Sequence, residues 1–459
     1  MIYRYGFRPF NSRVTPFPDL PFDTSPTMLR YRIAGMTSWS NVDGTAMNVP
    51  DTNRVVHTVE ISGLEEDTSY EFQLSTNALA TYCTWKNDPS TSMVVHWHSG
   101  KPFTKRYNSS YTQTIQKFKT APRTISEKIA IAQVSDTHGG GSVTESVFRR
   151  IGLIDNMRCI VHSGDIATGN GGASSPLTWY GFFDALEHAR DTGGHIIPLL
   201  VTPGNHEVLD GNSGVQYREG VGIKPNFQTK ERGDAEWYYC FFPTFPGLTG
   251  YGNITFGDYL SVWKLDPGVT TRMDTGQDVW LAQTMQEKQY IPNKVVSLHY
   301  PPWPAGRRYM GGYTQAIQNQ LLPIWEQHQP IVFSGHDHVF SVSPPIKGGT
   351  IETSGINVDE GTYYLGSGTT GEAMQPGRNP YTKWWIDIGI GSEWEYFDYE
   401  KAETGGLTTE PRPPHPEDGK SFDWQEGSHF WVMEMDYTQK TMTAYNPYDE
   451  IIHSFTVDN

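Results

Sequence analysis

The sequence predicts an α/β domain preceded by an all-β sandwich. Up to about residue 120, short β-type segments alternate with turn residues, and no long helical period intervenes. From Lys128 onward, compact apolar runs alternate with helical stretches, a pattern typical of α/β layers. We therefore expect two domains, at residues 1–124 and 125–459.

The amino-terminal segments have the spacing of sandwich strands, which we expect at 28–33, 55–61, 70–74, 93–97 and 112–118. Residues 59–64 followed by 68–72 resemble the corner of a fibronectin type III domain, where a Tyr hydroxyl bonds to nearby backbone. Tyr70 would be that residue. Residues 90–97 look like an early strand of such domains but follow the corner here, so we expect a rearranged strand order or an enlarged domain.

The second domain contains five apolar runs suited to buried strands. They are residues 129–134, 159–162, 196–202, 295–299 and 331–334. Aromatic residues recur at helical spacing within 177–190, which predicts a helix packed on the core. Residues 395–427 are rich in Glu, Pro and Gly and predict a long loop, followed by closing strands at 430–436, 441–445 and 451–457.

Composition limits the function classes. Charged residues make up 19% and aromatic residues 13% of the 459 residues, which indicates an ordered chain. The net charge of −16, with no Lys/Arg-rich run, argues against binding a nucleic-acid backbone. A small anionic substrate would need a local positive centre, for which bound cations are the usual source.

Cysteine content and hydropathy add two further limits. Three cysteines are too few for a disulfide scaffold or a Cys-type zinc cluster, although one internal bridge stays open. No stretch reaches the ~20 apolar residues of a membrane span, and the start of the chain does not predict a signal peptide. We expect no membrane association, and the compartment is not indicated.

Polar residues that can bind metal ions follow each of the five predicted strands, at the sheet edge where ligands bind in α/β proteins. Asp136 and His138 follow the first strand and would share a direction in an extended chain. Asp165 follows Gly164, which permits a tight turn. The remaining candidates are Asn205, His206, His299, His336 and His338.

This ligand set predicts two metal ions. Neutral imidazoles with carboxylate and amide oxygens suit Mn, Fe, Zn or Ni better than Ca or Mg. Two Asp, one Asn and four His exceed one coordination sphere unless a residue is shared, and Asp165 is the natural bridge.

The motifs Asp-x-His, Gly-Asp, Gly-Asn-His-Glu, His and Gly-His-x-His stand in the order found in calcineurin-like metallophosphoesterases, which residues 128–370 resemble. A fibronectin-like module before such a domain is most similar to the purple acid phosphatase branch. The resemblance implies a four-layer α/β/β/α domain. That branch has Gly where His138 stands and a Tyr ligand where Thr168 stands, so no purple charge-transfer colour is expected.

The resemblance also implies the roles of the site residues. The first ion would be held by Asp136, His138, Asp165 and His338, and the second by Asp165, Asn205, His299 and His336. Both would be divalent or mixed-valence Mn, Fe or Zn, and a hydroxide between them would attack phosphorus in line. The catalytic candidates are Asp165, as the bridge, and His206, as acid for the leaving oxygen or as an orienting group. Substrate contacts are expected from His206, Asn205 and Tyr300.

Further residues near these motifs have two readings each. Glu207 would cap or orient its loop, and Asp337 would be a solvated or supporting carboxylate. Tyr300, Trp303, Arg307 and Arg308 would form a pocket wall or an exposed loop. Residues 210–233 would form a lid, in which Arg218, Lys224 and Arg232 are solvated or bind substrate.

We expect a phosphomonoesterase acting on a small phosphate ester. One alternative is a phosphodiesterase acting on nucleotides or other small diesters. Another is an interaction protein with an accessory phosphoesterase domain, in which residues 1–27 dock on neighbouring subunits of a homo-oligomer or assembly.

Overall fold

The structure is a computed structural model. It describes residues 22–23, 27–49, 52–100, 111–168, 176–207, 216–218, 222–224, 236–243, 250–270, 276–303, 312–338, 340–343, 345–348, 357–358, 361–367, 370–371, 395–397 and 428–459.

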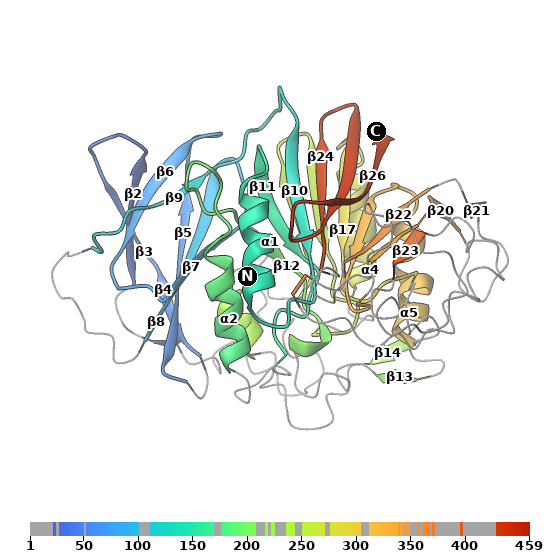
Figure 1. Ribbon diagram of the computed structural model, residues 1–459, viewed down its shortest axis with the longest axis horizontal. Coiled ribbons are helices and arrows are strands. Elements are labelled where there is room, and N and C mark those ends of the chain that lie inside the picture. The colour runs from blue at the N-terminus through green and yellow to red at the C-terminus, as the bar shows by residue number, and fades with distance from the viewer. Residues whose placement is uncertain are drawn as a thin grey trace.

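The amino-terminal part is a β-sandwich of two antiparallel sheets, as predicted (Figure 1). One sheet has the order β1 (Phe22–Asp23), β4 (Thr45–Asn48), β5 (Arg54–Ser62), β8 (Ser92–Gly100) and β7 (Ala80–Thr84). The other has the order β3 (Ser40–Asp43), β2 (Met28–Ile33), β6 (Ser69–Leu74) and β9 (Gln116–Lys119). The Tyr70 hydroxyl accepts a hydrogen bond from the Glu65 backbone N–H at 2.8 Å, which confirms the tyrosine corner.

The second part contains two large sheets (Figure 1). The first has the order β12 (Leu199–Val201), β11 (Met157–His162), β10 (Ile129–Val134), β24 (Phe430–Met435), β25 (Gln439–Tyr445) and β26 (Ile451–Asp458). The second has the order β15 (Gly252–Phe256), β16 (Leu260–Lys264), β17 (Asn293–Ser297), β18 (Ile331–Ser334), β22 (Tyr363–Ser367), β19 (Phe340–Val342) and β23 (Glu395–Phe397). Strands β10, β11 and β12 are parallel, as are β16, β17, β18 and β22.

The two sheets pack face to face. The Phe340 ring stacks on Trp431 with centroids 5.3 Å apart, and the Trp431 indole N–H donates to the Gly366 carbonyl at 3.1 Å. Deeper in the same interface, Ser163 Oγ lies 3.1 Å from Ser297 Oγ. These pairs join the six-stranded sheet to the seven-stranded sheet and form the two inner layers.

Helices cover the outer faces. Helices α1 (Ser142–Gly152) and α2 (Pro176–Leu186) lie on the six-stranded sheet, where Phe182 contacts His162 at 5.5 Å between centroids (Figure 1). Helix α4 (Gln277–Glu287) lies on the seven-stranded sheet, where the Trp263 indole N–H donates a hydrogen bond to the Thr284 hydroxyl. Helix α6 (Leu322–Trp325) lies on the same sheet, where the Trp325 indole N–H donates to the Tyr364 hydroxyl. The expected α/β/β/α arrangement is confirmed.

The remaining described elements are short. They are α3 (Glu236–Phe241), α5 (Gly312–Gln320), the hairpin of β13 (Gln216–Arg218) and β14 (Gly222–Lys224), the pair β20 (Ile346–Lys347) and β21 (Asn357–Val358), and a 3-10 turn at Asn205–Glu207. The β13–β14 hairpin lies beside α5 (Figure 1).

Several predicted bounds need correction. Residues 395–397, expected in a loop, form β23 and pair with β19. The remainder of the expected loop, residues 398–427, lies outside the described residues. The strands expected at 112–118 and 196–202 are shorter, at 116–119 and 199–201. The helix expected at 177–190 ends at Leu186.

The sandwich and the larger unit share a buried aromatic junction. Tyr82 and His98 of the sandwich contact Phe183 of α2, with ring centroids 4.9 and 4.4 Å away. The Tyr82 hydroxyl donates to the Phe241 carbonyl, and the Arg54 guanidinium lies 3.4 Å from the centre of the Tyr180 ring. The hydrophobic core therefore continues from one unit into the other.

All three cysteines, Cys83, Cys159 and Cys240, are buried free thiols, so the internal bridge left open by the sequence does not form. Among the helices that the structure describes, none combines the length and the apolar character needed to cross a bilayer.

Candidate metal centre

Five loops converge at one end of the two inner sheets. They follow β10, β11 and β12 of one sheet and β17 and β18 of the other. Within the seven-stranded sheet, the Gly335 backbone N–H donates to the His299 carbonyl. Between the sheets, the His336 backbone N–H donates to Asp136 Oδ2 at 2.9 Å, so loops of the two sheets touch. Ligand candidates 200 residues apart in sequence thereby reach one place.

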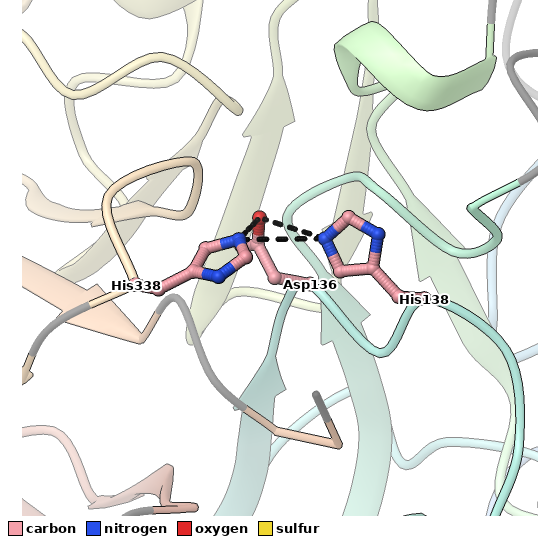
Figure 2. Close-up of side chains that lie close together, drawn as sticks. All are labelled: Asp136, His138 and His338. Atoms are coloured by element: carbon pink, nitrogen blue, oxygen red, sulfur yellow. Dashed lines mark hydrogen bonds and ion pairs between the residues drawn. The ribbon is translucent and has the colours of Figure 1, made fainter. Parts of the chain in front are cut away.

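Asp136, His138 and His338 form the first group, and their side chains point toward one another in Figure 2. His338 Nε2 lies 3.2 Å from Asp136 Oδ1 and 3.4 Å from His138 Nε2. His138 Nε2 is 3.8 Å from Asp136 Oδ1. Two imidazole nitrogens and one carboxylate oxygen therefore face a common point, all of them buried.

Asp165, His299 and His336 form the second group, with ligand atoms within 4.8 Å of one another. His299 Nε2 lies 3.1 Å from Asp165 Oδ2 and 3.0 Å from Asn205 Oδ1. Asp165 Oδ2 is also 3.9 Å from His138 Nε2 of the first group. The Asp165 carboxylate thus stands between the two groups.

His206 lies at the mouth of this arrangement. Its Nε2 is 4.0 Å from Asp165 Oδ2, and its ring centroid is 4.8 Å from that of His138. Its side chain keeps 28% of its surface exposed, whereas the side chains of Asp136, Asp165 and His299 keep 2% or less. The imidazole of His206 is therefore the most solvent-accessible of the clustered groups in the described part of the site.

Four ligand candidates have left-handed backbone, namely Asp136, His138, Asp165 and His336, with φ between 47° and 69°. The expected reason for the convergence of Asp136 and His138, an extended chain, is therefore wrong. Their side chains meet because the backbone turns at each residue. Such conformations cost about 1–3 kcal/mol each in a non-glycine residue and cluster at functional sites.

Glycines in the motifs make the close approach of the loops feasible. Gly164 has φ +95°, and a Cβ there would lie 2.7 Å from His299 Nδ1 and 2.8 Å from the Gly204 backbone. A Cβ at Gly335 would collide with Ser135 Oγ and the Asp136 carboxylate. The two glycines therefore admit neighbouring ligands that a side chain would displace.

Glu207 links two of the loops. Its carboxylate accepts hydrogen bonds from the backbone N–H groups of Gly204 at 2.6 Å, Asp165 at 2.8 Å and Ile166 at 2.7 Å. This geometry agrees with the expected orienting role. Burial, together with the negative charge of Asp165, raises the pKa of Glu207 to about 7.

Attraction between the Asp165 carboxylate and the neighbouring imidazoles outweighs burial in setting the pKa values of Asp165 and His299. Burial alone would raise the pKa of Asp165, but His299 and the other imidazoles outweigh it and hold that pKa well below its usual range. Burial would lower the pKa of His299, but the Asp165 carboxylate outweighs it and raises the pKa to about 9. The carboxylates therefore favour positive charge among the imidazoles, which a metal cation can supply in place of protons.

A hydrogen bond at Nδ1 sets the orientation and the tautomer of the His299 ring. Nδ1 lies 2.9 Å from the Ser163 carbonyl oxygen, which can only accept, so Nδ1 carries a proton. Nε2 is thus the nitrogen that faces Asp165 and Asn205, the usual arrangement of a metal-binding imidazole. Sequence reasoning missed this contact because a backbone carbonyl leaves no signal in residue type.

The other candidates are placed as follows. Tyr300 is buried, and its ring packs against His336 and His299 with centroids 4.6 and 5.3 Å away, so it supports two ligand candidates. Trp303 and Asp337 are also buried, which contradicts an exposed loop and a solvated carboxylate at these positions. Arg307, Arg308, Arg232 and most of the expected lid lie outside the described residues, while Arg218 and Lys224 belong to the β13–β14 hairpin.

Comparison with known proteins identifies the domain that contains these residues. The family model of calcineurin-like phosphoesterases matches residues 129–340, which include every ligand candidate. Residues 129–340 form a calcineurin-like phosphoesterase domain. The chain is therefore a phosphoesterase, and this family implies two divalent metal ions, which the two groups around Asp165 fit in donor type and number. No curated protein sequence matches the chain.

Solved structures show the same fold outside this domain as well. A purple acid phosphatase from yellow lupin (Lupinus luteus) seeds is similar with a TM-score of 0.59 and 13% identity, over 95% of this chain and 69% of that one. A structure of PhoD is similar with a TM-score of 0.54 and 12% identity, over 95% of this chain and 87% of that one. The phosphoesterase fold with its preceding β domain is thus shared with both.

Proposed function

We propose that this calcineurin-like phosphoesterase is a dinuclear enzyme that hydrolyses phosphate monoesters. The observation that carries the proposal is the place of Asp165, whose Oδ2 lies 3.1 Å from His299 Nε2 in one group and 3.9 Å from His138 Nε2 in the other. A carboxylate between two buried sets of imidazoles is suited to bridge two cations. The structural similarity to a purple acid phosphatase supports a monoester as the substrate.

We assign the ligands by group. Asp136, His138, Asp165 and His338 would hold one ion, and Asp165, Asn205, His299 and His336 the other, each ion being Mn, Fe or Zn. Such a pair supplies a nucleophilic water of lowered pKa and neutralises charge on the phosphoryl oxygens. The protein supplies the buried, pre-oriented ligands for both.

His206 would donate a proton to the leaving oxygen. Its Nε2 is close to Asp165, its ring is partly exposed, and it follows Asn205 in the same turn. An imidazole at the mouth of the site can reach the outer side of a bound ester. Tyr300, whose ring packs on His336 and His299, and Asn205 would also contact the substrate. We also place the boundary between the two domains at residue 124, where the sandwich strands end and β10 follows.

The test combines metal analysis with paired assays. The metal-replete protein is assayed on the mono- and bis-p-nitrophenyl esters of phosphate, and bound metal is measured by mass spectrometry. We expect two ions per chain and a preference for the monoester. Dominant diester cleavage would contradict the choice of substrate, and a metal-replete protein that cleaves neither ester would contradict the proposed activity.

Variants separate the roles. Asp165→Asn should lose bound metal and nearly all activity, whereas His206→Ala should keep both ions and lose about 10²–10⁴-fold in kcat. Asp155→Asn is the matched control, because Asp155 is an exposed carboxylate of the same domain. Unchanged kcat in His206→Ala would remove His206 from catalysis.

The assembly hypothesis rests on residues 1–27, of which the structure describes only 22–23 and 27. It stays a prediction of the sequence.

A further inference from the structure

Two buried polar side chains lie directly behind the ligand candidates without belonging to them. His162 is the last residue of β11, three positions before Asp165, and Thr137 stands between Asp136 and His138. His162 is fully buried and Thr137 is 3% exposed. Neither belongs to the groups of residues that could hold an ion.

The hydrogen bonds of these two residues form a chain with one direction. The Gly164 backbone N–H donates to His162 Nδ1 at 3.2 Å, which requires the lone pair on that nitrogen. The proton of the neutral ring is then on Nε2, which donates to Thr137 Oγ1 at 3.1 Å. The Thr137 hydroxyl in turn donates to the Ile166 carbonyl at 3.0 Å. Every donor and acceptor in the chain has a partner.

This chain of hydrogen bonds connects the two loops that carry three of the four left-handed ligand candidates, Asp136, His138 and Asp165. One end is Gly164, whose carbonyl also accepts from the Asp136 N–H at 2.9 Å, and the other end is Thr137. Backbone in this conformation persists only where surrounding contacts over-determine it. The Phe182 ring packs nearly perpendicular to the His162 ring, with centroids 5.5 Å apart, and restrains the imidazole from the side of α2.

We propose that His162 and Thr137 are positioning residues, which hold the Asp136–His138 loop against the Gly164–Asp165 loop so that both cations bind tightly. This inference rests on the proposed function only in taking Asp136, His138 and Asp165 as metal ligands. The two residues act through those ligands and do not touch substrate.

The test compares Thr137→Val with Thr137→Ser. Valine keeps the volume but removes the hydroxyl, and serine keeps the hydroxyl. Binding of Mn²⁺ alone is measured on metal-free protein by equilibrium dialysis, and the thermal unfolding of each metal-free variant is measured beside it. Removing a group that orients a ligand typically weakens metal binding by about 10–100-fold. We expect a loss of that size in the valine variant and wild-type affinity in the serine variant.

A second readout separates positioning from a general loss of structure. At saturating Mn²⁺ the valine variant should recover most of its kcat, because excess metal compensates for a weakened site. Wild-type Mn²⁺ affinity in Thr137→Val would overturn the inference, as would an equal loss in Thr137→Ser. If the valine variant does not fold, His162→Asn decides by the same measurement, because asparagine can accept from Gly164 but cannot reach Thr137.

The Mn²⁺ affinities of the variants test the positioning role independently of whether the protein hydrolyses phosphate esters. A wild-type protein that binds Mn²⁺ but hydrolyses no ester would contradict the proposed function, while the comparison of affinities would still decide this inference.

Discussion

The carboxylate of Glu207 lies behind the ligand loops and joins residues more than forty positions apart. Four backbone N–H groups donate to it, three from residues 165–167 and one from Gly204. These donors are buried and would be unsatisfied without it, which costs about 1–3 kcal/mol for each group. Glu207 therefore fixes Asp165 and Asn205 relative to each other without approaching the ions.

Glu207→Gln should destabilise the protein by about 1–3 kcal/mol and lower metal affinity, because the amide NH₂ replaces an acceptor and faces a backbone donor. Urea unfolding and Mn²⁺ dialysis measure the two effects. Glu145→Gln serves as the control, since Glu145 is an exposed residue of α1 paired with Arg149. Equal stability of the two variants would show that the four backbone contacts contribute little.

At the scale of elements, the site requires loops that follow different strands to pack more closely than a side chain at their glycines would allow. Gly335 follows β18, and a Cβ there would meet the side chains of Ser135 and Asp136, which follow β10. Gly204 follows β12 and meets Asp165 after β11 in the same way. The loops can therefore lie this close only because Gly335 and Gly204 have no Cβ.

Gly335→Ala should destabilise the fold by about 1–3 kcal/mol, because the added methyl group forces Ser135 and Asp136 to move. It should also lower the metal content, since Asp136 is displaced. Gly100→Ala, at the end of β8, is the control, because a Cβ there meets nothing within 4 Å. Calorimetry and metal analysis check the prediction, and a fully metallated Gly335→Ala protein would refute it.

The sequence predicted the buried strands β10, β11, β12, β17 and β18 of the phosphoesterase domain because their apolar runs are continuous. It did not predict β16 or β22, which are buried strands of the same domain. The runs at 129–134 and 331–334 match β10 and β18 in both bounds. Strands β3, β4 and β7 were missed. They are four or five residues long, and β7 (Ala80–Thr84) is buried on both faces although two of its residues are threonines. Such strands have neither an apolar run nor an alternating pattern.

The sequence motifs predicted which residues the structure brings together, but not the geometry of their backbone. Motif order gave the residues that the structure clusters, because each motif directly follows a strand. The left-handed backbone at Asp136 and His138 could not be predicted, since neither residue type requires it. Thr137 and His162 were missed because their partners are backbone groups and each other, which become neighbours only when the loops fold together.

Across the whole molecule, the sandwich is joined to the phosphoesterase domain through buried histidines as well as aromatic rings. His96 bonds to Thr58 and Thr84 within the sandwich, and its ring stacks on Tyr82. His98 lies between Phe183 and Phe241, and in the described part of the chain neither of its ring nitrogens has a hydrogen-bond partner. The junction therefore requires neutral imidazoles.

The junction should lose stability in mild acid. Burial lowers the pKa of His96 to about 3, and burial with the nearby Arg54 holds the pKa of His98 well below its usual value. In the unfolded chain both would have a pKa of about 6.5. Their neutral forms thus favour the folded state above pH 6.5, and this contribution falls as the pH drops toward 3, by up to about 1.4 kcal/mol per pH unit for each histidine.

Urea unfolding between pH 7 and pH 5 tests this dependence, because most carboxylates titrate below that range. The His98→Leu variant should show a shallower fall in the free energy of unfolding than the wild type, whatever its stability at pH 7. Parallel pH profiles for the two proteins would remove His98 as the cause.

The position of β24 beside β10 has a consequence for how the protein is made. The strand that carries the first ligands has one edge that pairs only with residues 430–435, roughly 300 positions later. A ribosome adding about 5–20 residues per second needs about 15–60 s to cover that distance. During this interval the nascent domain presents an open hydrogen-bonding edge beside the ligand loops, and pairing with β24 closes it.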